Sequence, residues 1–148
     1  MAEIRQYSSR HVLIELGNET ATALADGTFV SIEPHGEGTS KQVGADGAVA
    51  VGLDPDWTAS VNLTFMQTSP SAEKLQERYL KEQRTGIIEF FPILIQDLTG
   101  TTLFHAEQAW VANMVKREFS KREPSNNIEI TIETGDATWE VVQPAHTK

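Results

Sequence analysis

The strongest constraint on the fold is a two-residue alternation of apolar and polar side chains. In the segment 57–66 the apolar set is Trp57, Ala59, Val61, Leu63 and Phe65, and the polar set is Thr58, Ser60, Asn62 and Thr64. The segment 128–133 repeats this pattern, with Ile128, Ile130 and Ile132 opposite Glu129, Thr131 and Glu133. Successive side chains of a strand point to opposite faces, so a one-residue slip would bury carboxylates. The sequence therefore predicts half-buried strands with a firm register.

Further strands are predicted at 11–16, 28–32, 87–98, 101–105, 108–115 and 139–142. The strand at 87–98 is the most apolar, and Pro92 restricts it to an edge or a bulge. Asp26-Gly27 precedes a strand and is typical of a hairpin turn. These patterns predict a mainly β fold, a sandwich or barrel of two packed antiparallel sheets.

One amphipathic helix is predicted from Pro70 to about Arg84. Ser69 is a suitable N-cap, and Gly86 is placed to end the helix. An apolar stripe is formed by Ala72, Leu75, Tyr79 and Leu80, and a basic face by Lys74, Arg78, Lys81 and Arg84. The helix is expected to cover a sheet through its stripe and to present its basic face outward.

The segment 36–56 differs from the rest of the chain because glycines punctuate it and its apolar residues are small and sparse. Long segments of this kind are uncommon in compact domains and are usually functional. The sequence predicts a protruding loop or hairpin that contacts other subunits. The candidate contact residues are Val43, Gly44, Ala45, Asp46, Gly47, Val49 and Val51.

Length and charge narrow the class of protein. The 148 residues fit one domain, and we predict no membrane insertion by this chain, since it has no long apolar run. The formal net charge of −9 argues against simple nucleic-acid binding. Eight of the 12 basic residues lie in the segments 74–84 and 116–122. For 116–122, a solvated connection or a contact with acidic protein is favoured over a phosphate contact.

No chemical motif of an enzyme is present. There is no cysteine, no pair of histidines at zinc-binding spacing, no nucleophile elbow and no phosphate-binding glycine loop. His35-Gly36-Glu37 could contribute to a metal site and Asp54-Pro55-Asp56 resembles a fragment of a calcium loop, but a solvated histidine and a turn are the favoured interpretations. The sequence predicts a protein that is not an enzyme and that holds no cofactor and no metal.

Five segments in order resemble the tail tube proteins of contractile-tailed bacteriophages, which are related in fold to pyocin and type VI secretion tube proteins. They are ADGTFVSIE at 25–33, KQVGADG at 41–47, LTFMQTSPS at 63–71, IQDLTGTTL at 95–103 and AWVA at 109–112. The resemblance extends over roughly residues 10 to 140, and the segment 116–127 matches it least. The family has no catalytic motif.

The resemblance implies a structural virion protein, assembled in the host cytoplasm and located in the virion tail. Six subunits form a ring, the rings stack into a tube inside a contractile sheath, and an extended loop reaches the neighbouring ring. The implied partners are further copies of the chain, the sheath, and baseplate or terminator proteins, with DNA only as passing cargo. A tube that releases DNA quickly should avoid cations in its lumen, so Glu33, Glu129 and Glu133 are candidates for lumen-facing residues.

Two alternatives remain open. The chain could be a tube subunit of a phage-derived bacteriocin or of a type VI-like contractile injection system, which ejects without carrying DNA. It could also be a carbohydrate- or partner-binding β-sandwich of a phage tail. That module would favour exposed aromatic residues on a loop, whereas Trp57, Trp110 and Trp139 all lie in predicted strands.

Overall fold

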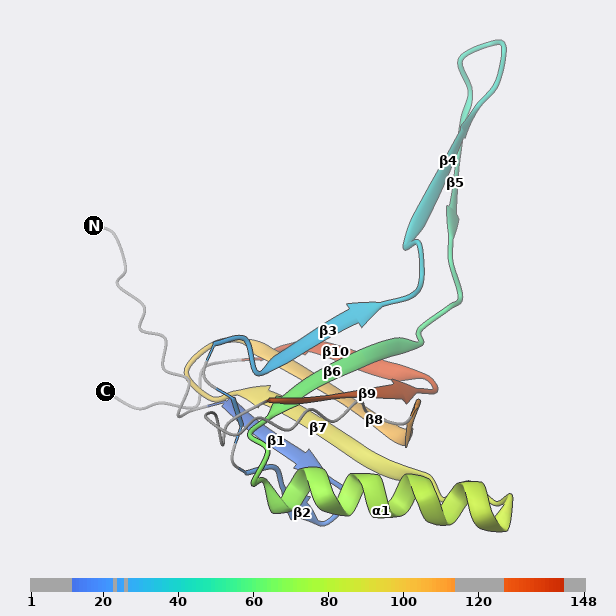
Figure 1. Cartoon of the computed structure of the whole chain (residues 1–148). Coiled ribbons are helices and arrows are strands. Elements are labelled where there is room, and N and C mark those ends of the chain that lie inside the picture. The colour runs from blue at the N-terminus through green and yellow to red at the C-terminus, as the bar shows by residue number, and fades with distance from the viewer. Residues whose placement is uncertain (1–11, 23, 26, 114–126, 143–148) are drawn as a thin grey trace, which may run out of the picture.

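The computed structural model describes residues 12–22, 24, 25, 27–113 and 127–142. This part of the chain is mainly β with one helix (Figure 1), which confirms the predicted fold class. The elements are β1 (Val12–Leu16), β2 (Glu19–Thr20), β3 (Val30–Pro34), β4 (Thr39–Val43), β5 (Val49–Leu53), β6 (Ala59–Phe65), α1 (Pro70–Thr85), β7 (Phe91–Asp97), β8 (Thr102–Val111), β9 (Ile128–Thr134) and β10 (Ala137–Val141).

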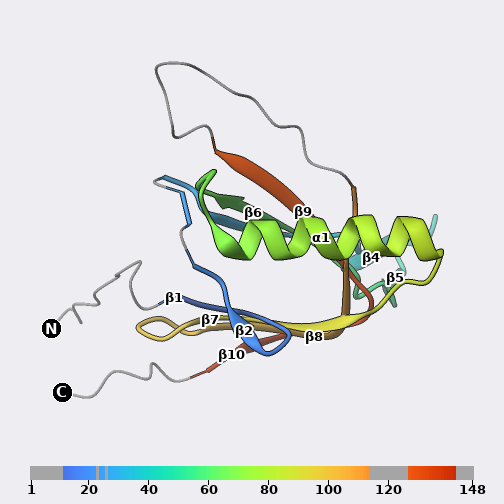
Figure 2. The ribbon, with the colours of Figure 1, turned by 60° about the horizontal axis from the view of Figure 1, so that its bottom comes forward.

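The two layers of the sandwich are parts of one antiparallel sheet. Its strand order is β2-β1-β7-β8-β9-β6-β3, and β10 also pairs with β8. The first half of β8 pairs with β10, and its last residues pair with β9. The sheet turns over at β8, so that β3, β6 and β9 face β1, β7 and β10 across the core (Figure 2).

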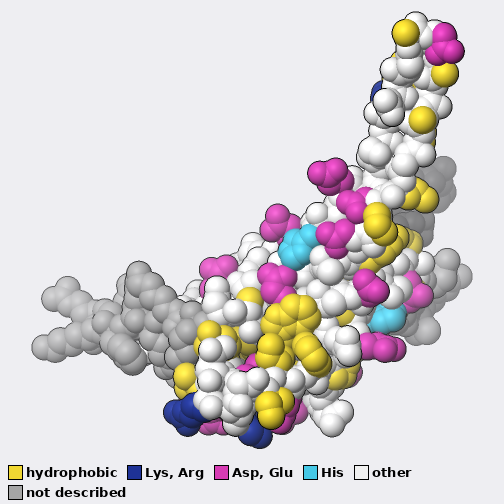
Figure 3. Space-filling model, turned by 90° about the vertical axis from the view of Figure 1, so that its right-hand side faces the viewer, with side chains coloured by type: hydrophobic (Ala, Val, Ile, Leu, Met, Phe, Trp, Pro, Cys, Tyr) yellow, Lys and Arg dark blue, Asp and Glu magenta, His cyan; other side chains and the backbone are white. Residues whose placement is uncertain are grey.

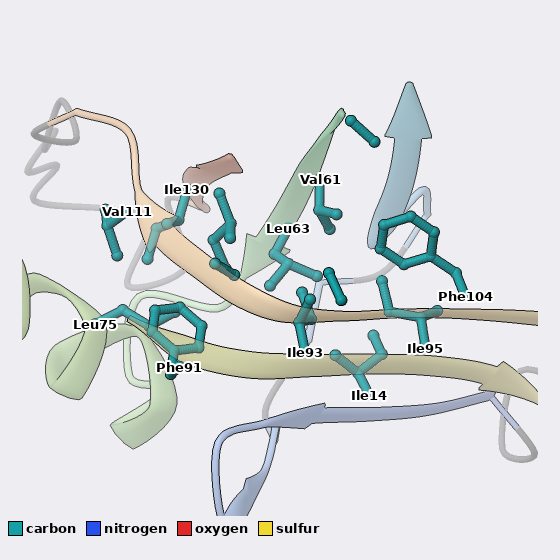
Figure 4. Packing of buried hydrophobic residues seen from close by; sticks show 14 of the residues in the cluster. Ile14, Val61, Leu63, Leu75, Phe91, Ile93, Ile95, Phe104, Val111 and Ile130 are labelled. Atoms are coloured by element: carbon teal, nitrogen blue, oxygen red, sulfur yellow. The ribbon is translucent and has the colours of Figure 1, made fainter. Parts of the chain in front are cut away.

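The core lies between these layers and is built from one face of each strand. Val61, Leu63 and Phe65 of β6 and Ile130 and Ile132 of β9 are fully buried. They meet side chains of β1, β7 and β8, including Ile14, Ile93, Ile95 and Phe104 (Figure 4). Their polar neighbours in β6 and β9 face the other way, as the two-residue alternation predicts.

The two strands predicted at 101–105 and 108–115 form the single strand β8, so their separation was wrong. The alternation of buried and exposed residues in β8 breaks between Ala106 and Ala109, because Phe91 pairs with Ala109 and Ile93 with Ala106. One extra residue of β8 is therefore accommodated opposite Pro92, which is a bulge. The bulge returns Ala109 and Val111 to the core face, so both halves of the strand stay buried on the same side. Pro92, which the sequence placed at an edge or a bulge, lies opposite this bulge.

The strand predicted at 87–98 begins only at Phe91, so its first four residues were wrongly assigned. Ile87, Ile88 and Phe90 are 67%, 50% and 52% exposed and lie outside any strand. Their apolar side chains are typical of a buried strand, but the segment connects α1 to β7 over the surface. Phe90 packs edge to face against Trp110, with ring centroids 5.7 Å apart.

The caps of α1 are as predicted. The Ser69 hydroxyl accepts from the Ala72 N–H, and Gly86 ends the helix at φ 73°. Ala72 and Leu75 are buried, and Leu75 lies beside Phe91 (Figure 4). Leu80 was wrongly placed in the apolar stripe, since it is 36% exposed. Near the C-terminal end of α1 the buried residue is Glu82 and not Leu80. The Glu82 Oε1 atom accepts from the Glu89 N–H at 3.1 Å.

The segment 36–56 forms a hairpin of β4 and β5, which pair only with each other in the described structure. The hairpin leaves the body on the side away from α1 (Figure 1). Every residue of both strands is exposed.

Candidate functional site

The hairpin has two unlike faces. Residues directly opposite each other in an antiparallel pair lie on the same face. The pairs Lys41–Val51, Val43–Val49 and Thr39–Leu53 therefore share one face, and Gln42–Ala50 and Ser40–Gly52 share the other. The first face is apolar except for Thr39 and Lys41, and Val43, Val49, Val51 and Leu53 on it are 57–82% exposed.

The tip of the hairpin is a hydrogen-bonded turn that contains the candidate contact residues 44–47. The Gly44 N–H donates to the Ala48 carbonyl at 2.7 Å, and the Gly47 N–H donates to the Gly44 carbonyl at 3.0 Å. The Asp46 carboxylate accepts from the Ala48 N–H at 3.1 Å, and Gly47 has φ 88°, which favours glycine. The structure thus groups all seven candidate contact residues at the outer half of one projecting element.

The root of the hairpin is fixed by two carboxylates. Asp54 accepts from the N–H groups of Glu37 at 2.7 Å and Asp56 at 2.9 Å. Asp56 accepts from the Thr58 hydroxyl at 2.6 Å and the Thr58 N–H at 2.9 Å. These two bonds, with the hydroxyl contributing most and His35 adding attraction, hold the pKa of Asp56 below its ordinary value. The root is therefore held most firmly when Asp56 is ionised.

A groove of about 680 Å³ lies at this root, and sequence reasoning missed it. Its apolar walls are Pro34, Leu53, Pro55, Trp57 and Trp139, and its rim carries Glu37, Asp54 and Asp56. The expectation that Trp57 belongs to a buried strand face was wrong, since it precedes β6 and is 59% exposed. Trp139 lies in β10, packs on Phe104 with centroids 4.9 Å apart, and is still 39% exposed.

The outer face of β3, β6 and β9 brings the three glutamate candidates together. Register places Glu33 beside Ser60 and Ser60 beside Glu133, and Glu129 lies on the same face beside Thr64. The other residues of this face are Ser31, Asn62 and Thr131, and these strands contain no lysine or arginine. Acidic and histidine side chains gather below the hairpin, while Lys and Arg visible on the body lie at its far end (Figure 3).

His35, Ser60 and Glu133 meet on this face but do not form a catalytic triad. His35 Nε2 lies 2.6 Å from Ser60 Oγ, and the Ser60 hydroxyl donates to Glu133 at 2.7 Å. A triad needs the carboxylate on the distal ring nitrogen, whereas His35 Nδ1 contacts Thr58 Oγ1 at 3.1 Å. The serine proton is held by a carboxylate, and His35, which directly follows β3, links the end of that strand to Ser60 of β6. In the described part of the chain, no three His, Asp or Glu residues are grouped to hold a metal ion.

The basic residues predicted for the outer face of α1 are mostly engaged within the chain. Lys74 Nζ lies 2.8 Å from Glu19, while Arg78 and Lys81 lie 3.9 and 3.6 Å from Glu89. Exposed pairs of this kind add little stability, yet they reduce the positive potential that the helix offers. Arg84 completes the set near the helix end. The basic segment 116–122 lies outside the described residues.

Comparison with solved structures shows the fold in other proteins. The chain is similar to the anti-feeding prophage cap (AFP tube terminating cap), with a TM-score of 0.68 and 11% identity over 96% of this chain and 95% of that one. A chain of the PVC sheath–tube complex, from an extracellular contractile injection system in its extended state, gives 0.59 and 13% over 93% of each chain. The PVC sheath/tube terminator gives 0.62 and 11% over 95% and 100%.

At these identities the likeness establishes a shared fold. No family model matches the sequence, and no curated protein matches it either. Among the described residues, no helix has both the length and the apolarity needed to cross a membrane.

Proposed function

We propose that this chain is a non-catalytic subunit of the inner tube of a contractile tail, in which copies form six-membered rings that stack. The observation that carries the proposal is the likeness of its fold, over more than nine-tenths of the chain, to cap, terminator and sheath–tube structures of contractile systems. The projecting hairpin supports it, because its exposed apolar residues do not contribute to the core of the domain and are typical of an interaction site. The sheath, the baseplate and a terminator are the expected further partners.

The outer face of β3, β6 and β9 is proposed to line the lumen. Glu33, Glu129 and Glu133 would repeat around each ring, with hydroxyl and amide side chains between them. Duplex DNA binds by exchanging counterions for lysine and arginine, and this face offers neither. DNA would therefore pass without being held. A bacteriocin or secretion tube would need no such surface, and the acidic face favours the DNA-conducting tail.

A capping role is a second candidate because two of the similar structures are a cap and a terminator. The two roles differ in how the protein grows. A tube subunit stacks ring on ring, whereas a cap forms one ring and stops. The exposed Trp57 and Trp139 remove one argument against a carbohydrate-binding module, but they lie in a groove formed by the hairpin's own root.

The proposal is tested by negative-stain microscopy of the purified protein over a range of concentrations. Hollow tubes of variable length are expected for a tube subunit. Single rings that never stack indicate a cap. A protein that stays monomeric at high concentration, by light scattering, overturns both assignments.

A further inference from the structure

The apolar face of the hairpin needs a cover. An isolated two-stranded hairpin is marginally stable in water, and exposed apolar strands promote association. Val43, Val49 and Val51 lie on one face and are more than half exposed. The tip turn and the root hydrogen bonds hold this face in an extended form before any partner arrives. An apolar hairpin face that is already ordered in this way is suited to bind an apolar surface of a partner.

The groove between Trp57 and Trp139 has the matching character. Two partly exposed indoles, two prolines and Leu53 form its apolar walls. The chain's own hairpin cannot fill it. Leu53 is part of the groove wall, and Val49 lies four residues further along a strand, about 13 Å away. The hairpin also projects away from the body (Figure 1). A segment that fills the groove would therefore come from another molecule.

Charge distinguishes the groove from another exposed apolar surface of the body. Lys41 is the basic residue of the hairpin's apolar face. The groove carries Glu37, Asp54 and Asp56 on its rim and no lysine or arginine among its lining residues. The other surface, formed by Ile87, Ile88 and Phe90, includes Glu89, which is paired with Arg78 and Lys81 of α1. Lys41 therefore meets three carboxylates with no cation among the lining residues at the groove, and a single carboxylate already shared by two cations at the other surface.

We infer that the apolar face of the hairpin in one copy occupies the Trp57–Trp139 groove of a second copy, with Lys41 against the carboxylate rim. The inference rests on the proposed assembly of this chain with itself. The contact joins two different patches, so the copy that inserts its arm keeps a free groove and the copy that receives it keeps a free arm. Such contacts close into rings or continue as filaments. The same contact would therefore propagate the assembly from copy to copy.

Disulfide cross-linking tests this contact cleanly because the chain has no cysteine. Val49→Cys protein is mixed with Pro55→Cys protein, a pair that leaves both indoles in place, and oxidised during assembly. Mass spectrometry of the digested product should find the 49–55 linkage in excess over 49–49 and 55–55. A parallel mixture of Val49→Cys with Ile88→Cys should give several-fold less cross-linked product. Dominance of the 49–49 or 49–88 linkage overturns the inference.

A matched pair of charge substitutions provides the second readout. Val49→Asp and Ala50→Asp add the same charge at adjacent positions on opposite faces of the hairpin. Val49→Asp should abolish sedimentable assembly, and Ala50→Asp should reduce it little, with unchanged circular dichroism for both. Equal effects of the two variants overturn the inference. Tubes without the 49–55 linkage would refute the groove contact alone, whereas absence of any assembly in the unmodified protein would refute the proposed function as well.

Discussion

At the scale of residues, the root of the hairpin depends on a few hydrogen bonds and one close backbone approach. Asp54 and Asp56 collect the backbone N–H groups of the root, and Gly36 lies so close that a Cβ there would run into the backbone carbonyl of Asp56. These contacts set the direction in which the hairpin leaves the body. Two predictions follow from their chemistry.

The first concerns the ionisation of Asp56. Its pKa is lower in the folded state, so its contribution to stability is full above the unfolded pKa, about 3.9, and is lost as the pH falls through the folded pKa. Thr58→Val removes the hydroxyl donor, and the folded pKa of Asp56 should rise toward the ordinary value. Titration of the carboxyl carbon by NMR measures this directly. An unchanged pKa in the variant would show that the hydroxyl is not the cause.

The second concerns Gly36. Gly36→Ala should lower the free energy of unfolding by about 1–3 kcal/mol, because the new methyl group overlaps a backbone carbonyl that is held by the root. It should also speed amide exchange at Asp54, whose N–H donates to the Gly38 carbonyl. Gly135→Ala is the control, since a Cβ there meets nothing closer than 3.7 Å. Equal melting temperatures for the two variants would contradict the steric argument.

At the scale of elements, α1 is held to the sandwich by few apolar side chains. Leu75 is 5% exposed and packs beside Phe91, whereas Leu80, further along the helix, is 36% exposed. Leu75→Ala should destabilise the fold by about 2–5 kcal/mol. Leu80→Ala should change stability by about 0.5 kcal/mol or less. Chemical denaturation of both variants measures the difference, and similar midpoints would mean that the helix is not anchored through Leu75.

At the scale of the whole molecule, the body and the hairpin are separable in their energetics. The hairpin strands pair only with each other in the described structure, and none of their residues belongs to the core. Shortening the hairpin across 43–51 should therefore leave the melting temperature nearly unchanged and block tube growth. Microscopy and thermal unfolding of the same sample test both statements. Tubes of normal length from the shortened protein would refute an assembly role for these residues.

The proposed lumen makes a prediction about DNA. Assembled tubes should not retain duplex DNA even at low salt, because the outer face of β3, β6 and β9 lacks cations. Replacing Glu33 and Glu129 with lysine should create retention that decreases steeply as salt is added. Glu133 is left in place, since it accepts from Ser60. Tubes of the double variant that bind no more DNA than unmodified tubes would contradict the electrostatic argument.

The sequence by itself determined the local structure. Alternation identified the strands that line the core because one face of each meets the other layer, and the residues around α1 identified its caps because Ser69 and Gly86 act within one helical turn. Even the outer face with Glu33, Glu129 and Glu133 follows from register, although only pairing across β6 shows that the three share it.

Tertiary structure decided the rest because it depends on residues far apart in the chain. The segment 102–111 forms one continuous strand because of a bulge that only its pairing with β7 reveals. The exposure of Ile87 and Phe90 depends on where α1 ends relative to the sheet. The groove needs Trp57 from the hairpin root and Trp139 from β10, which no local pattern connects. Periodicity reports which side of a strand is apolar; only the packing of the layers decides whether that side is covered.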